Sequence, residues 1–216
     1  YLVPGTSEFD GGRRDLPPSA HYTGPCLWEE QADRSPVESL RQALPGRRLV
    51  LVTEGSLYSG DATLLRTAAS GLANKPMNVL MLALYKRNPA SLNPGDLAAT
   101  MRIGEWAPLG EILPFCDAIV ACGDSETTMA ALAAGVPMVA VPEILDQPEV
   151  AMCLANSGAG IRIPARRCSP ARLAAAVDLV LNDPTYRANA TRISARMAEY
   201  NGGERAAELL GALVEP

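Results

Sequence analysis

The stretch that decides the fold is residues 118–141, which read AIVACGDSETTMAALAAGVPMVAV. Two short, continuously apolar segments, at 118–121 and 138–141, enclose a segment of helical composition that stops at Gly135. Glycine commonly follows the last turn of a helix. A short apolar run is typical of a strand buried on both faces, as in a parallel sheet. The stretch therefore predicts a strand–helix–strand unit whose two strands run parallel.

The same alternation continues on both sides of this unit. Further strands are predicted at 49–52, 79–84, 101–103 and 161–163, and helices at 61–73, 109–115, 147–156, 170–181, 185–200 and 204–214. Strands that alternate with crossover helices are typical of α/β folds. We therefore predict an α/β fold with a doubly wound parallel sheet over residues 48–216.

Residues 1–47 differ from the rest of the chain because they are rich in Pro, Gly and charged residues. We interpret them as an extended lead-in with one short helix at 35–43, where Ser35 is the cap and Pro36 the first helical residue. The chain begins with Tyr1 rather than Met, which indicates a fragment of a longer protein.

The composition excludes several classes of protein. The 216 residues are 48% hydrophobic and 20% charged, which predicts a globular chain with a core rather than a disordered one. A net charge of −5 argues against nucleic-acid binding, and a single histidine, His21, excludes a multi-His metal site. The five cysteines form no Cys-x-x-Cys pair, which favours reduced thiols and a cytoplasmic location. No apolar run reaches the roughly 18 residues of a membrane span.

Ligands of doubly wound sheets bind beyond the carboxyl ends of the strands, so the turns that follow the strands are the candidate sites. Gly55-Ser56 follows the first strand, where a small turn lets the backbone approach a ligand; an ordinary turn is an equal alternative. Trp106 lies in the loop after the third strand. Its ring can stack on a flat base, or it can simply pack into the edge of the domain.

The turn after the strand at 118–121 combines a glycine with hydroxyl side chains at a helix start. Free N–H groups at a helix N-terminus bind anions, and Ser125 or Thr127 can add hydroxyl donors to a phosphate beside Gly123. The alternative is plain helix capping by Asp124 or Ser125. The spacing does not separate the two, although a carboxylate at position 124 competes with a phosphate.

The turn after the strand at 138–141 ends in Asp146-Gln147. Together these side chains offer the acceptors and donors that bind a polyol. The alternative is that Asp146 caps the helix that follows.

Taken in order, these four segments resemble the C-terminal domain of the GT-B glycosyltransferases, and most closely the family 1 enzymes of actinomycete natural-product pathways. Residues 3–6 and 21–25 resemble the interdomain linker of that family. Residues 131–137, which are followed by a Pro and an Asp-Gln pair, also resemble the family's sequence. The resemblance implies the Rossmann-like C-terminal half of a GT-B fold, with residues 1–47 as linker and an N-terminal acceptor domain outside the chain.

The resemblance also implies a role for each matched position. The base of the donor nucleotide is expected at Trp106, Ala107 and Ser56, its diphosphate at Cys122, Gly123, Asp124, Ser125 and Thr127, and its sugar at Asp146 and Gln147, with Gly55 in the turn of the donor cleft. No catalytic residue is expected in this chain, because the family places its base in the N-terminal domain, and no metal or cofactor is implied.

Four positions depart from the family pattern. Cys122 and Asp124 stand where the family has His and Gly, and Ala130 and Leu109 stand where it often has Glu and Gln. The favoured function is the donor-binding half of an inverting glycosyltransferase that moves a sugar from a dTDP- or UDP-sugar to a small hydrophobic natural product. The alternatives are a degenerate, non-catalytic partner-docking module of the same fold and, ranked last, a sugar-nucleotide epimerase. A homodimer is left open.

Overall fold

The computed structural model describes residues 1–13, 15–27, 46–54, 62–82, 97–104 and 107–213. Its main sheet has six strands, all parallel to their neighbours, in the order β5-β4-β3-β6-β7-β8. Their bounds are β3 (Leu49–Thr53), β4 (Asn78–Leu82), β5 (Met101–Gly104), β6 (Ala118–Ala121), β7 (Met138–Ala140) and β8 (Gly160–Arg162). This is the order of a doubly wound nucleotide-binding sheet, so the predicted α/β fold is confirmed.

The central strands are apolar on both sides because both of their faces are covered. All residues of β3, β4, β6 and β7 are buried, whereas the edge strands β5 and β8 are partly exposed. Along β3 the side chains alternate between two core clusters, with Leu49 and Leu51 in one and Val50 and Val52 in the other. A continuous apolar run therefore supplies two cores at once.

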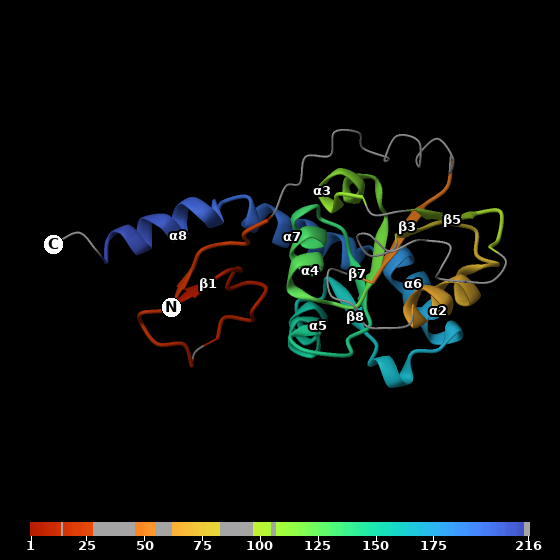
Figure 1. The fold of residues 1–216 in the computed structure, drawn as a ribbon, viewed down its shortest axis with the longest axis horizontal. Coiled ribbons are helices and arrows are strands. Elements are labelled where there is room, and N and C mark those ends of the chain that lie inside the picture. Colours follow the sequence, from red (N-terminus) through yellow and green to blue (C-terminus); the bar gives the residue numbers. More distant parts are fainter. Residues whose placement is uncertain (14, 28–45, 55–61, 83–96, 105–106, 214–216) are drawn as a thin grey trace.

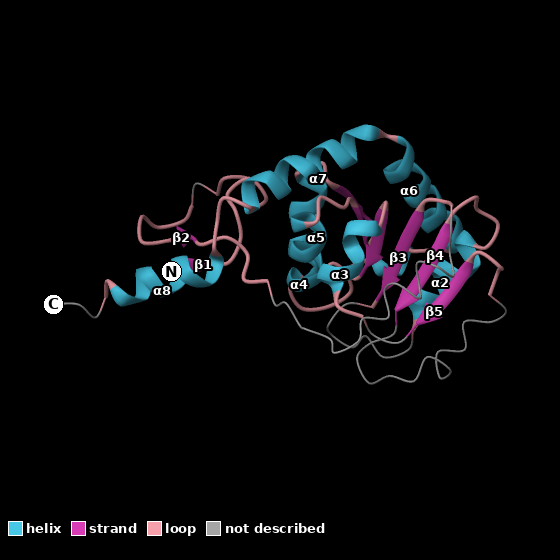
Figure 2. Cartoon of the chain, turned by 90° about the horizontal axis from the view of Figure 1, so that it is seen from above, coloured by secondary structure: helices cyan, strands magenta, loops and turns pink. Residues whose placement is uncertain are grey.

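Helices cover the two faces of the sheet, as Figures 1 and 2 show. α2 (Thr63–Leu72) and α6 (Pro170–Asn182) pack on one face, where Leu65 and Leu173 are fully buried. The other face carries α3 (Leu109–Ile112), α4 (Ser125–Ala133), α5 (Gln147–Asn156) and α7 (Pro184–Met197). Short 3-10 turns, η2 (Leu113–Phe115) and η3 (Ala165–Arg167), follow α3 and β8.

The predicted boundaries agree with the observed ones or differ from them by up to three residues. The helix predicted at 185–200 begins at Pro184, because Asp183 caps it by accepting the Thr185 N–H at 2.9 Å, and it ends at Met197. The strand predicted at 161–163 is β8, at Gly160–Arg162. The helix predicted at 35–43 and the end of the strand predicted at 79–84 lie outside the described residues.

The first residues form a small unit of their own beside the main sheet. β1 (Leu2–Val3) and β2 (His21–Tyr22) pair in parallel, and α8 (Gly202–Gly211) lies next to them at the end of the molecule away from β5 (Figure 1). The Tyr22 hydroxyl donates to Asp10 at 2.7 Å. The sequence predicted only an extended lead-in here, because a two-residue strand carries no periodicity.

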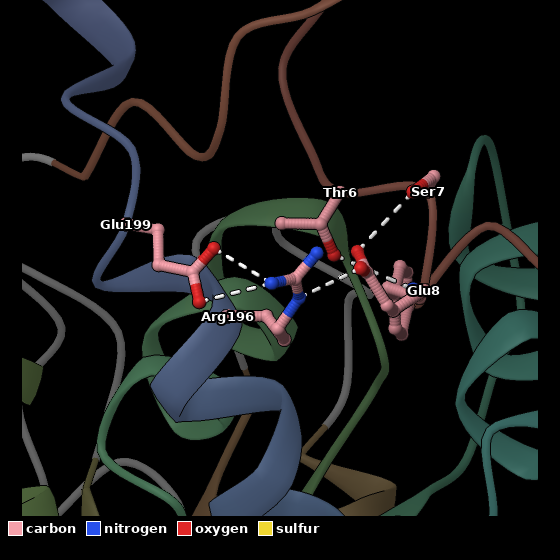
Figure 3. A network of polar contacts seen from close by, with 6 residues as sticks. Thr6, Ser7, Glu8, Arg196 and Glu199 are labelled. Carbon is pink, nitrogen blue, oxygen red and sulfur yellow. Dashed lines mark hydrogen bonds and ion pairs between the residues drawn. The ribbon is translucent and has the colours of Figure 1, made fainter.

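This unit is fastened to α7. Arg196 of α7 donates to Glu8 at 2.8 Å and to Glu199 at 2.7 Å, as Figure 3 shows. Gly24 has a φ of +85°, and a Cβ there would lie 2.2 Å from the Cβ of Tyr200, so only glycine fits. The described part of residues 1–24 therefore packs against α7 and the residues that follow it.

Candidate functional site

The candidate site lies at the carboxyl edge of the sheet. The order of the strands reverses between β3 and β6, and the helices that come next in the chain, α2 and α4, lie on opposite faces of the sheet. A crevice at such a switch point is where doubly wound sheets bind their ligands. The loops after β6 and β7 lead into α4 and α5, whose N-termini therefore meet at this edge.

The N-terminus of α4 is capped by its own chain. The Oδ1 of Asp124 accepts the Thr127 N–H at 2.9 Å, and both residues are buried. Gly123, just before the cap, has a φ of +83°, and a Cβ there would lie 3.1 Å from that of Ala140. Asp124 thus caps α4, as the second of the two alternatives predicted. The positive φ of Gly123 and its close approach to Ala140 of β7 explain why position 123 is a glycine.

Asp146 reaches across to α4 and does not cap its own helix. Its Oδ2 accepts the Ser125 N–H at 3.1 Å and the Ser125 hydroxyl at 2.5 Å, and it makes no side-chain cap bond to α5. Leu145, the residue before it, is exposed and has a φ of +53°, a left-handed conformation that costs a non-glycine residue about 1–2 kcal/mol. Backbone strain of this kind clusters at functional sites.

Gln147 is held by the loop that precedes it. It is fully buried, and its Oε1 accepts the N–H groups of Glu143 at 3.0 Å and Ile144 at 3.1 Å. This fixes the amide so that Oε1 faces the loop and Nε2 points away from it. Within the described residues Nε2 has no hydrogen-bond partner, although buried polar groups nearly always find one. Gln147 therefore presents an unused donor at this edge.

Cys122 is a buried, neutral thiol. Its Sγ lies 3.1 Å from the backbone oxygen of Glu54 and 3.1 Å from the Oδ2 of Asp124. Burial raises the pKa of the thiol well above its ordinary value, and the carboxylate of Asp124 raises it further. A thiol has one proton, so it can donate to only one of these two acceptors at a time.

The remaining predicted positions are only partly described. Ala107 is buried in the core cluster under α3 and α4. Gly55, Ser56 and Trp106 lie outside the described residues.

A cavity of about 820 Å³ opens at the same edge, on the side of α2 and α6. Its lining includes Glu54, Cys122 and Glu143, together with Arg162 at the end of β8 and Arg166 and Arg167 of η3. No role was predicted for this loop, although it follows a strand as the other candidate turns do. The sequence does contain a signal for an anion site here, because three of the six residues 162–167 are arginines.

In the described part of the chain, no group of three or more His, Cys, Asp and Glu side chains is placed to hold a metal ion. No helix there is both long enough and apolar enough to cross a bilayer.

The six-stranded doubly wound sheet, with two helix N-termini and an unpaired buried amide N–H donor at its carboxyl edge, is an α/β domain with a candidate ligand site at that edge. Residues 80–213 match the profile of the family described as erythromycin biosynthesis protein CIII-like, C-terminal domain, and the chain belongs to this family.

The chain is also similar to curated enzymes of actinobacteria. The chain is 31% identical to 4'-demethylrebeccamycin synthase of Lentzea aerocolonigenes over 99% of its own length and 50% of the relative's. It is 28% identical to demethyllactenocin mycarosyltransferase of Streptomyces fradiae over 91% of its length and 41% of the relative's. The chain thus spans about half the length of the curated relatives it matches.

Solved glycosyltransferases share the fold. The spinosyn rhamnosyltransferase superposes with a TM-score of 0.81 at 23% identity, over 99% of this chain and 56% of that one. The predicted C-terminal domain of a GT-B glycosyltransferase is confirmed by these comparisons.

Proposed function

We propose that the chain is the donor-binding half of an inverting glycosyltransferase, which transfers a sugar from a dTDP- or UDP-sugar to a small hydrophobic natural product. Family membership and the antibiotic-pathway relatives support this proposal. The acceptor would be bound by an N-terminal domain outside this chain, joined to it through residues 1–47. The five cysteines, all free, support a reducing, cytoplasmic location.

The observation that carries the proposal is the buried amide of Gln147. Its Oε1 is committed to two backbone N–H groups, so its orientation is set before any ligand arrives. An Nε2 donor left unpaired in a buried position is costly unless a ligand oxygen pairs with it. A sugar hydroxyl supplies such an oxygen, and Asp146 can accept the proton of a neighbouring hydroxyl.

With the sugar at Gln147, the positions of the diphosphate and the base of the donor follow. The diphosphate would lie at the N-terminus of α4, with Cys122 and Asp124 at its border and with Gly123, Ser125 and Thr127 as donors. To reach the sugar, Asp146 would leave Ser125, and the freed N–H and hydroxyl of Ser125 would then bind the phosphate. The base would lie against Trp106, Ala107 and Ser56, next to the turn at Gly55.

The chain's own part in transfer is to bind and orient the donor. In an inverting transfer, the acceptor hydroxyl attacks the anomeric carbon from the face opposite the diphosphate, which departs while a base takes the hydroxyl proton. We assign that base to the N-terminal domain and none to this chain. The chain alone would then bind the donor without transferring its sugar.

Gln147→Glu tests the proposal. Glutamate keeps an oxygen for the N–H groups of Glu143 and Ile144 but has no Nε2 donor. We expect calorimetry to give weaker binding of dTDP-glucose or UDP-glucose, by about tenfold, while binding of the free nucleotide stays the same. Far-UV circular dichroism would check that the variant folds. Equal affinity of both proteins for the sugar nucleotide, or no binding of any nucleotide at millimolar concentration, would count against the proposal.

One observation favours the second candidate, a non-catalytic module of the same fold. Two carboxylates, those of Asp124 and Asp146, accept hydrogen bonds at the N-terminus of α4, which is where a diphosphate would have to bind. Negative charge at this point opposes a second anion. Absence of nucleotide binding by both the natural chain and Asp124→Asn would favour this candidate.

A further inference from the structure

The cavity on the side of α2 and α6 has features that the donor site does not use. It lies between the end of β8, η3 and the first turns of α2, and its volume is about 820 Å³. The described residues that line it do not include Ser125, Asp146 or Gln147. It borders the donor site at Glu54, which follows β3, and at the loops that follow β6 and β7, where Cys122 lines both.

Arg162 is the central residue of this cavity. It is the last residue of β8 and pairs in register with Ala140 of β7, so its backbone is fixed by the sheet. The side chain is partly buried, and its Nε is buried without a hydrogen-bond partner among the described residues. A desolvated guanidinium is costly unless an anion and hydrogen-bond acceptors compensate it.

The acidic residues of the cavity do not supply that compensation. Glu54 and Glu143 both line it, yet in the described part of the chain no ion pair joins either of them to Arg162. The planar guanidinium carries five donors in a fork that matches the oxygens of a phosphate or a carboxylate. The unmatched partner of Arg162 is therefore an oxyanion.

The surroundings of Arg162 add positive potential to the cavity. Arg166 and Arg167, both exposed, lie on its rim. α2 begins beside it with Ala62 at the N-cap position, a residue that has no side-chain oxygen to cap the helix, and Thr67 of α2 lines the cavity. Arginines and a helix N-terminus together favour a bound anion.

We propose that this cavity is a second ligand site, which binds the phosphate or carboxylate group of a small sugar-like molecule through Arg162. The carboxylate of Glu143 on the opposite loop accepts the hydroxyl protons of the same molecule, which selects a polyhydroxylated anion over a bare one. The volume of the cavity exceeds that of a hexose, so the ligand binds without displacing protein groups.

Calorimetric titration of the whole chain tests this assignment. The probes are glucose 1-phosphate, glucuronate, inorganic phosphate and neutral glucose. We expect glucose 1-phosphate or glucuronate to bind with a dissociation constant in the millimolar range or below, and glucose not to bind. The comparison of the phosphate probe with the carboxylate probe identifies the oxyanion.

Arg162→Met removes the guanidinium and keeps the apolar stem. We expect at least a tenfold loss of affinity for the anionic sugar and an unchanged or higher melting temperature, because an uncompensated charge has been removed. Arg192→Met, at an exposed position of α7, is the matched control and should leave affinity unchanged. If Arg162→Met fails to fold, the double variant Arg166→Ala/Arg167→Ala takes its place, with a smaller loss expected.

The test separates this site from the donor site. Gln147→Glu should leave binding of the anionic sugar unchanged, and dTDP should not compete with it. Competition by dTDP, unchanged affinity in Arg162→Met, or no binding of either anionic sugar at 10 mM, which is roughly the limit of useful affinity, would overturn the assignment.

Discussion

Asp146→Ala should tighten the binding of the free nucleotide, whereas the binding of the sugar nucleotide should gain much less or weaken. In the structure Asp146 holds the Ser125 N–H at 3.1 Å and its hydroxyl at 2.5 Å, the donors that we assign to the diphosphate. Removing the carboxylate frees both donors and deletes a negative charge beside the phosphate. It also deletes the acceptor that we assign to a sugar hydroxyl.

The magnitudes follow from these distances. Two unit charges about 4 Å apart interact by about 1 kcal/mol in water and about 4 kcal/mol at an effective dielectric constant of about 20. Asp146 is exposed, so the lower figure applies. Freeing the donors adds about 0.5–1.5 kcal/mol. The two contributions together are about 1.5–2.5 kcal/mol, so we expect dTDP to bind about ten- to seventyfold more tightly. Loss of a charged hydrogen bond to the sugar costs about 1.5–3 kcal/mol.

The assay is calorimetry with dTDP and dTDP-glucose, and with UDP and UDP-glucose, at one ionic strength. The quantity to compare is the dissociation constant of the free nucleotide divided by that of its sugar nucleotide. This ratio should fall by about tenfold or more in the variant. Glu149→Ala is the matched control, because it removes an exposed acid from the first turn of the same helix. Equal weakening of both ligands, or the same shift in the control, would refute the reasoning.

Two further predictions concern stability. Arg187 of α7 donates to the backbone oxygens of Gly135, Cys116 and Asp117 at 2.9, 3.1 and 2.7 Å, so Arg187→Met should lower the free energy of unfolding in urea by about 2–4 kcal/mol; an equal loss in the exposed control Arg192→Met would contradict this. Burial raises the pKa of Cys116 from 9.0 to about 12, so its contribution to stability should be complete below pH 9 and be lost as the pH rises from 9 towards 12. Urea titrations at several pH values should show this decline, and Cys116→Ala should flatten it.

Much of the fold was predictable because its signals are local. Apolar runs such as 118–121 give buried strands wherever both faces of a sheet are covered, and residues such as Gly135 and Asp183 end or cap helices by contacts within a few residues. Boundaries were less accurate at Met197 and Gly160, since the last turn of a helix and the start of an edge strand depend on neighbours in space.

The candidate site was predicted in outline but not in its contacts. The sequence placed Asp124, Ser125, Asp146 and Gln147 near the carboxyl edge, because the turns after parallel strands meet there. The sequence left open whether Asp146 caps α5. In the structure its side chain does not cap α5 but accepts a hydrogen bond from Ser125 of α4. That bond joins residues 21 positions apart, which no local pattern encodes.

By itself, then, the sequence determined the alternation of strands and helices, the parallel sheet and the edge at which ligands bind, since each follows from local composition and the chirality of crossovers. Only the tertiary structure decided that the carboxylate of Asp146 accepts hydrogen bonds from Ser125. It alone also decided that, among the described residues, Nε2 of Gln147 and Nε of Arg162 are buried without a hydrogen-bond partner. The ion pair between Glu8 and Arg196 also depends on the tertiary structure. These features depend on pairs of side chains brought together from distant parts of the chain, and their energies arise only after the backbone has folded.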